Sequence, residues 1–360
     1  MSFLRHHPVG ARIPGSQHSV VVSLPAMADV IGYEERRPDT MRAVQTGYPR
    51  FIRHPFLLAA TQQAAEEKAL NPSACLPVAS VAAAKQIAQF LPAATARILP
   101  VDDWALLQIS AEENLAERAG KLIQHLGVTL PTRQAEGWLV AQGKLPQAEP
   151  EKLFSGDADA RVRQALAPLL APVCAADIFL CNSGMNAVYA AIEAVRAVQR
   201  PRGRNIWLQL GWLYTDTTAI FQKCLGAEEI FLLQENAPDR AALEKIFAEH
   251  GDRLAGIITE APTNPLLQTA DLEWLAATAH RHGALCIVDP SAAGLINVDV
   301  LPFADLVVTS LTKYAGHCGD ILLGCIAANP ASPDCAALQT ALAAAYTPAY
   351  ARDLARLAGV

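Results

Sequence analysis

The sequence predicts an α/β fold: a mainly parallel sheet flanked by helices, with an extra helical region before it. Two observations predict this class. From about residue 175, short apolar runs alternate with amphipathic segments, as strands alternate with connecting helices in a parallel sheet. Before that point, residues 56–150 are rich in Ala and repeat apolar residues at three- and four-residue spacing, which is typical of amphipathic helices. Sheets of this kind bind ligands just beyond the carboxyl ends of their strands.

Taken in order, the chain divides into four expected parts. Residues 1–55 are rich in Pro, Gly and His and are expected to form an irregular N-terminal arm, followed by a helical insertion over 56–150. Residues 151–330 are expected to form the α/β domain, and 331–360 the start of a C-terminal domain that the chain lacks. The predicted strands are DIFLCN, NIWLQL, EIFLL, LAGIITE, ALCIVD, DLVVTS and ILLGCIAAN. The predicted helices between the first five strands are AVYAAIEAVRAVQ, TTAIFQKCLG, RAALEKIFAEHG and LEWLAATAHRHG.

The composition argues against several classes of protein. Hydrophobic residues make up 52% of the 360 residues and charged residues only 18%, which excludes a disordered chain. A formal charge of -6 without long Lys/Arg runs argues against nucleic-acid and membrane partners. The uncharged stretch 69–84 contains Pro, Asn and Ser, which argue against a membrane-spanning helix. The N-terminus shows no secretory signal. Eight Cys without a CxxC pair predict neither disulfides nor a metal site, so we expect a cytoplasmic protein.

Candidate ligand-binding groups follow three of the predicted strands. The sequence SGM at 183–185 follows DIFLCN and opens a helix, where glycine and the first-turn amides favour an anion. The loop EAPTNP follows LAGIITE and presents the amide side chain of Asn264, and Asp289 ends ALCIVD. Each group taken alone is as typical of a turn or a helix cap as of a binding site.

The most informative group follows DLVVTS, where Ser310 and Thr312 precede Lys313 and several glycines come after it. A lysine directly after a buried strand is poorly placed to be a solvated surface residue. A desolvated lysine loses its proton more readily and becomes a nucleophile toward carbonyl groups. The other three groups follow earlier strands of the same predicted sheet. The pattern therefore predicts that Lys313 is a reactive residue.

The motifs SGM, LYTDTTAIF, EAPTNP, IVDPS and TSLTKYAGHCGD, in this order, resemble those of the Cys/Met-metabolism family of pyridoxal-phosphate enzymes. That family includes cystathionine γ-synthase and the cystathionine lyases. The segment from SVVVSLPAMADV to GYPRF is similar to the fungal-type cystathionine γ-synthases. The resemblance covers about residues 18–55 and 175–330, and it implies the large domain of aminotransferase fold type I with pyridoxal 5'-phosphate as cofactor.

The resemblance implies a role for each matching residue. Lys313 would carry the cofactor and then move protons, and Asp289 would pair with the pyridine nitrogen. Tyr214 would stack on the ring as a second catalytic residue, and Asn264 would contact the ring oxygen. The phosphate would be held by Gly184, Met185, Ser310, Thr312 and, from the arm of a neighbouring subunit, by Tyr48 and Arg50. The chain would therefore be a homodimer or a homotetramer.

The sequence departs from the family pattern at three places. Asp289 is followed by Pro-Ser-Ala instead of Asn-Thr-Phe, and Thr215 and Asp216 replace the glycines that follow the stacking Tyr. No residue matches the Arg that binds the α-carboxylate of the substrate, since that Arg belongs to the domain expected after 360.

The implied activity is a γ-replacement that joins an O-acylated homoserine to cysteine, in trans-sulfuration and methionine biosynthesis. A cystathionine lyase or an O-acylhomoserine sulfhydrylase would carry the same motifs around the lysine, so both remain alternatives. A further alternative is a catalytically defective scaffold or fragment, which binds the cofactor but lacks the substrate-carboxylate Arg.

Overall fold

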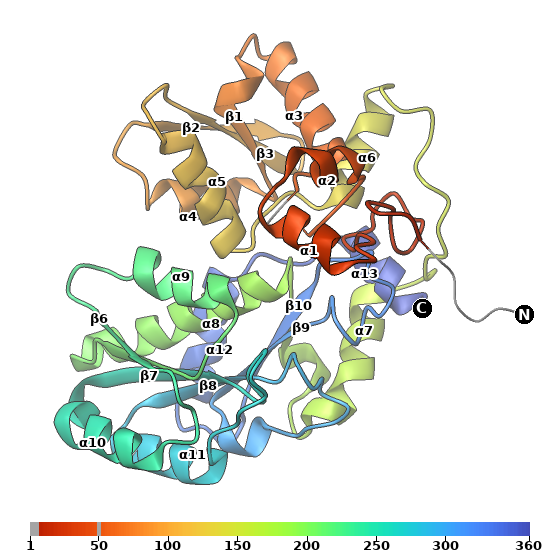
Figure 1. Cartoon of the computed structure of the whole chain (residues 1–360). Helices are drawn as coiled ribbons and strands as arrows, with labels where there is room; N and C mark the ends of the chain where they lie inside the picture. Colours follow the sequence, from red (N-terminus) through yellow and green to blue (C-terminus); the bar gives the residue numbers. More distant parts are fainter. Residues whose placement is uncertain (1–6, 49–51) are drawn as a thin grey trace, which may run out of the picture.

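The computed structural model describes residues 7–48 and 52–360. A seven-stranded sheet with its helices forms the lower part of the molecule in Figure 1, and a three-stranded sheet with its helices forms the upper part. The N-terminal segment lies where the two parts meet. In the described residues no helix has both the length and the apolar character needed to cross a membrane.

The seven predicted apolar runs all form strands of one sheet. The strands are β4 (Ile178–Cys181), β5 (Ile206–Leu210), β6 (Ile230–Gln234), β7 (Leu254–Glu260), β8 (Leu285–Asp289), β9 (Leu306–Ser310) and β10 (Gly324–Ala328). Their order in the sheet is β4-β10-β9-β8-β7-β5-β6. β10 is antiparallel to both of its neighbours, and the pairings from β9 through β8, β7 and β5 to β6 are parallel. The predicted α/β class with a mainly parallel sheet is confirmed.

Helices cover both faces of this sheet because successive strand residues point to opposite sides. Ile258 of β7 packs in the cluster that contains α8, whereas its neighbour Ile257 packs with α10 and α11. Val307 of β9 packs in a third cluster, with α7 and α13. The helices are α7 (Ala158–Leu166), α8 (Gly184–Gln199), α9 (Thr215–Cys224), α10 (Arg240–His250), α11 (Leu272–Arg281), α12 (Cys335–Ala345) and α13 (Ala351–Ala358).

Residues 56–150 are not purely helical, and the expectation of a helical insertion is wrong in this respect. The region contains α3 (Pro55–Glu67), β1 (Cys75–Val78), α4 (Val81–Ala88), β2 (Ala96–Val101), β3 (Trp104–Ile109), α5 (Leu115–His125) and α6 (Thr132–Ala141). The strands pair antiparallel in the order β1-β3-β2. β3 is buried on both faces, with Leu106 packed toward α3 and α6 and Leu107 toward α4 and α5. A run buried on both faces has no period-two alternation, so its sequence cannot be distinguished from a buried helix.

The N-terminal segment contains two short helices, α1 (Met27–Glu34) and α2 (Pro38–Ala43). Its described residues, 7–48, contribute no strand to either sheet and form one isolated β-bridge, between Arg12 and Val22. It contacts the loop after β9, because the backbone N–H of Val20 donates to the carbonyl of Gly319 over 2.8 Å. This contact places the arm beside the loop that carries Lys313.

Candidate cofactor site

A cavity of about 950 Å³ lies at the carboxyl ends of β4 and β5, between the two parts of the molecule. Its walls come from the N-terminal segment, from α3 and α5, and from the first turns of α8 and α9. Four residues that the sequence analysis assigned to the cofactor line it: Tyr48, Gly184, Met185 and Tyr214. The structure thus brings together residues that are up to 166 positions apart in the chain.

The first turn of α8 is open toward this cavity. The Oγ of Ser183 caps the helix by accepting from the N–H of Asn186 (3.1 Å), which leaves the amides of Gly184 and Met185 outside the cap. A Cβ on Gly184 would lie 2.8 Å from the Cβ of Ser310, so a larger residue there would clash. Glycine therefore permits the helix amides and Ser310 to approach each other closely, as a phosphate cradle requires.

Lys313 follows β9 and lies beside the N-terminal segment. Its Nζ is 4.6 Å from the centre of the Tyr48 ring, a cation–π distance. Burial lowers the pKa of Lys313, and the negative charge of Asp289 opposes that shift. The structure places Tyr48 next to Lys313 of its own chain, whereas the resemblance implied a contact with a neighbouring subunit. Arg50, the other predicted arm residue, lies outside the described residues.

Asp289 ends β8 next to the strand that leads to Lys313. Burial raises its pKa to about 6, opposed by hydrogen bonds from Ser291 and by the charge of Lys313. The N–H of Ser291 donates to Oδ1 of Asp289 (2.8 Å), and the Oγ of Ser291 accepts from the N–H of Ser310 (2.8 Å). The Pro-Ser-Ala sequence that departs from the family pattern therefore ties the carboxylate to the end of β9.

Glu260 is a residue of the site to which the sequence analysis gave no role. It ends β7 and is 7% exposed, with Oε1 accepting from the N–H of Tyr214 (2.7 Å) and Oε2 from the N–H of Asn264 (3.1 Å). Burial raises its pKa to about 7, and the nearby charge of Asp289 adds to the shift. One buried carboxylate thus holds the backbone of two predicted cofactor contacts. A charged residue ending an otherwise apolar strand is the signal that marks it in the sequence.

The remaining predicted contacts lie on loops at the same edge of the sheet. Asn264 is exposed after β7. The hydroxyl of Thr312 is buried, accepts from the N–H of Leu323 (3.1 Å) and lies 3.3 Å from its carbonyl. That hydroxyl is therefore used within the protein, and the part assigned to Thr312 in phosphate binding stays a prediction.

Asp216 is one of the two residues that stand where the family pattern has glycines. It is buried in the first turn of α9, and the Nε2 of Gln124 donates to both carboxylate oxygens (2.9 and 3.0 Å). The Nδ1 of His125 lies 3.2 Å from the same carboxylate. Both partners belong to the end of α5, so Asp216 ties the helix that begins after Tyr214 to the region 56–150.

The cavity also has a basic wall that the sequence analysis missed. Arg36, Arg53 and Lys121 line it, from the N-terminal segment, the residues before α3, and α5 respectively. No local motif contains these three residues, because they come from separate segments that only the fold brings together. They give the cavity positive charge in addition to the helix amides.

These residues fit pyridoxal phosphate. The set contains an amine in the field of a buried carboxylate, uncapped helix amides in a space that admits only glycine, and two tyrosines at the cavity. A comparison with protein families agrees with this set: residues 160–356 match the model of the Cys/Met metabolism PLP-dependent enzymes. The chain belongs to this family. It is therefore a pyridoxal-phosphate-dependent enzyme, as the motifs predicted, and the fold is the one expected for it.

Individual relatives differ in their named activities. The chain is 37% identical to an L-2-amino-4-chloropent-4-enoate dechlorinase/desaturase of Streptantibioticus cattleyicolor, over 96% of this chain and 69% of that protein. It is 26% identical to a cystathionine γ-synthase-like protein of Aspergillus thermomutatus, over 95% of this chain and 68% of that protein. The cystathionine γ-synthase of Saccharomyces cerevisiae is 30% identical over 43% of this chain and 26% of its own length.

Solved structures match little more than half of the chain. A cystathionine γ-synthase from Xanthomonas oryzae pv. oryzae has a TM-score of 0.46 and 23% sequence identity. The match covers 57% of this chain and 50% of that structure. The chain thus spans half the length of this solved relative.

Proposed function

We propose that this chain acts on 2-amino acids that carry a leaving group on Cγ. The observation that carries the proposal is the position of Lys313 at the carboxyl edge of the sheet, in the field of the buried Asp289 and over the ring of Tyr48, which lines the cavity. The named relatives support the position of the leaving group. Cystathionine γ-synthases are named for reaction at Cγ, and the chlorine in the dechlorinase's substrate name is on C4, which is Cγ.

When bound, pyridoxal phosphate withdraws the electron pair left on Cα after its proton is removed. Asp289 would hold a proton at the pyridine nitrogen, in a buried position where water would not compete for the pairing. Burial also lowers the pKa of Lys313, so a larger fraction of its amine is neutral and able to accept the Cα proton. After releasing this proton, Lys313 would be neutral again and could accept a proton from Cβ, and the group on Cγ would leave with the electron pair of its bond. Glu260 accepts a hydrogen bond from the backbone N–H of Tyr214, which supports the proposed stacking of Tyr214 on the ring.

The first candidate reaction is the γ-replacement, in which the thiol of cysteine adds at Cγ of an O-acylhomoserine. The motif order around Lys313 and the similarity of the N-terminal segment to fungal-type cystathionine γ-synthases support it. A lyase or sulfhydrylase reaction uses the same residues. The second candidate is an elimination without an added thiol, which the relative matched over 96% of this chain favours.

A homodimer or homotetramer is part of this proposal. Large apolar side chains are exposed on loops that follow four strands of the sheet, at the edge that carries Lys313: Trp212, Leu266, Leu267, Ile296 and Tyr314. Such a concentration of exposed apolar residues is typical of a protein interface. A second copy packed there would cover these side chains and lie next to Tyr48.

The test combines cofactor absorbance with product analysis. The purified chain with pyridoxal phosphate is expected to show visible absorbance that is absent in Lys313→Ala and retained in Lys245→Ala, whose lysine is exposed on α10. O-acetylhomoserine with cysteine is expected to yield cystathionine at a rate reduced more than about 1,000-fold in Lys313→Ala, since the mutant loses its proton-transfer group.

Two other outcomes separate the candidates. Product from 2-amino-4-chloropent-4-enoate without added thiol, and none from O-acetylhomoserine with cysteine, would favour the elimination. Absorbance that no amino acid perturbs would contradict both reactions and favour the cofactor-binding scaffold.

A further inference from the structure

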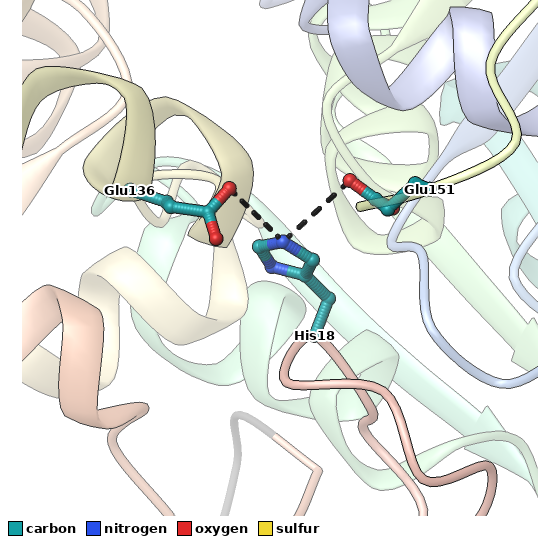
Figure 2. Close-up of side chains that lie close together, drawn as sticks. All are labelled: His18, Glu136 and Glu151. Carbon is teal, nitrogen blue, oxygen red and sulfur yellow. Dashed lines mark ion pairs between the residues drawn. The ribbon is translucent and has the colours of Figure 1, made fainter. Parts of the chain in front are cut away.

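A second charged centre lies outside the residues that line the cofactor cavity. His18 of the N-terminal segment is completely buried between Glu136 of α6 and Glu151, which follows α6 in the chain (Figure 2). Its Nδ1 lies 2.9 Å from the hydroxyl of Thr132. Its Nε2 has no hydrogen-bond partner among the described residues. The unpartnered nitrogen instead faces carboxylate oxygens of Glu136 (3.4 Å), Glu151 (3.8 Å) and Glu149 (3.9 Å).

The geometry around the imidazole suits a metal ion. An imidazole binds a metal through an unprotonated ring nitrogen, and the hydrogen bond of the other nitrogen decides which one is free. If Nδ1 donates to the Thr132 hydroxyl, the lone pair of Nε2 points at negatively charged oxygens. That arrangement is repulsive unless a cation lies between them.

The groups around His18 carry a net negative charge that a bound cation would offset. The ion pairs and hydrogen bonds that surround it connect five carboxylates with three guanidinium groups: Glu136, Glu149, Glu151, Asp320 and Asp353 with Arg133, Arg352 and Arg356. Most of these groups are buried. The described network therefore has two more negative than positive charges, and an uncompensated charge inside a protein is costly.

We propose that His18, Glu136 and Glu151 bind a divalent transition-metal cation of the zinc class. Their ligand atoms all lie within 4.8 Å of one another. Ligands about 2.0–2.1 Å from a tetrahedral ion are separated by about 3.3 Å. The distances from Nε2 of His18 to Glu136 (3.4 Å) and Glu151 (3.8 Å) are close to that value, and the two carboxylate oxygens lie within 4.8 Å of each other. One imidazole nitrogen with carboxylate oxygens suits Zn²⁺ or Mn²⁺ better than Ca²⁺, which prefers oxygen alone.

Two arginines orient the proposed ligands. Arg352 donates to Oε2 of Glu136 and to Oε1 of Glu151, each over 2.7 Å, and Arg133 donates to Oε2 of Glu151. A carboxylate oxygen has two lone pairs, so it accepts from a guanidinium and binds a metal at the same time. The positive charges of the arginines would repel the cation, and the two excess negative charges of the carboxylates would offset that repulsion.

The proposed ion has a structural consequence. It would connect the N-terminal segment, through His18, to α6 and to the chain around Glu151. The same segment leads on to Tyr48, whose ring lies over Lys313. A metal at His18 would therefore fix the arm in the position that brings Tyr48 to the cofactor site.

The test measures metal binding to the full chain without substrate. The protein is treated with a chelator and titrated by calorimetry with Zn²⁺ or Mn²⁺ alone, and bound Co²⁺ is followed by its visible absorbance. We expect one equivalent to bind and to raise Tm. Affinity should fall at least about 100-fold in His18→Asn. It should be unchanged in His280→Asn, whose histidine pairs with Asp305 just before β9, at the opposite end of that strand from Lys313.

A conservative variant keeps the test independent of folding. If His18→Asn loses its far-UV circular dichroism, Glu136→Gln removes one ligand charge with little change of volume and is expected to lower affinity at least about 10-fold. No uptake by the wild-type chain, or the same uptake in the wild type and the folded ligand variants, would overturn the proposal. Neither result depends on Lys313 or on turnover, so a failure here is distinct from a failure of the proposed function.

Discussion

At the scale of single residues, the site depends on buried carboxylates at strand ends. Asp289 and Glu260 end neighbouring parallel strands and pair in register, and the charge of Asp289 adds to burial in raising the pKa of Glu260. The N–H of Ser291 donates to the carboxylate of Asp289 and holds it in position. Two backbone N–H groups hold the carboxylate of Glu260 in the same way. We propose that Lys313 and Asp289 carry the chemistry and that Glu260 positions Tyr214 and its loop.

Glu260 leads to a prediction about pH. Its pKa in the folded chain is about 7, raised above the value of 4.5 for an exposed Glu, so the folded state binds more protons than the unfolded state between these values. Its contribution to stability is therefore present at low pH and is lost as pH rises through 7. We expect Glu260→Gln to lower Tm more at pH 5 than at pH 8, since only the wild type has this pH dependence. Equal Tm differences at both pH values would contradict the assigned role.

At the scale of elements, the site is assembled by contacts between helices that are distant in sequence. Asp216 at the start of α9 accepts hydrogen bonds from Gln124 at the end of α5. Tyr214 is the residue that precedes α9, so its position depends on how that helix is held. The strands β1 and β3 in turn support α5 through a shared core. The region 56–150 thus supports the cofactor site directly.

The Asp216 contact can be tested by substitution. Asp216→Ala removes an acceptor from Gln124 and His125 and is expected to destabilise the fold by about 2–3 kcal/mol, because buried donors lose their partner. Pyridoxal-phosphate affinity is expected to fall about 10-fold as Tyr214 becomes less well held. Asp271→Ala is the matched control: it removes the cap of α11, costs about 1 kcal/mol and leaves cofactor affinity unchanged. Unchanged affinity in Asp216→Ala would show that α5 does not support Tyr214.

At the scale of the whole molecule, one continuous core joins the two sheets. Residues of α4 and α5 pack in the same cluster as α8 and the seven-stranded sheet. The cofactor cavity lies beside this shared core, and exposed apolar loops surround the end of the sheet that carries Lys313. These loops are the basis for the proposed association of two copies.

The proposed association predicts the effect of a charge on those loops. Leu267 is 69% exposed after β7, so Leu267→Glu is expected to leave the folded chain intact and to convert the dimer to monomer. Leu233→Glu, on edge strand β6, is the control, because this leucine is also exposed (45%) but lies outside this loop surface. Light scattering coupled to size exclusion gives the mass of each variant. A wild-type chain that stays monomeric at micromolar concentration would contradict the association.

The sequence by itself determined the order of the strands along the chain and the chemistry at their ends. Parallel strands end at a common edge, so Gly184, Asn264, Asp289 and Lys313 could be assigned to one site before any contact was known. These signals are local, because a strand end and its polar residue are adjacent in sequence. The predicted roles of these residues in cofactor binding remain proposals supported by their common location.

Only the tertiary structure decided the remaining parts of the molecule. The three-stranded sheet was missed because β3 is buried on both faces and carries no alternating pattern. Three further contacts join residues from separate segments: the hydrogen bonds of Asp216, the cation–π contact of Lys313 with Tyr48, and the basic wall of the cavity. The carboxylates around His18 likewise come from α6 and the chain after it. Such contacts depend on how distant segments pack, and that information is spread over the whole chain instead of residing in any one motif.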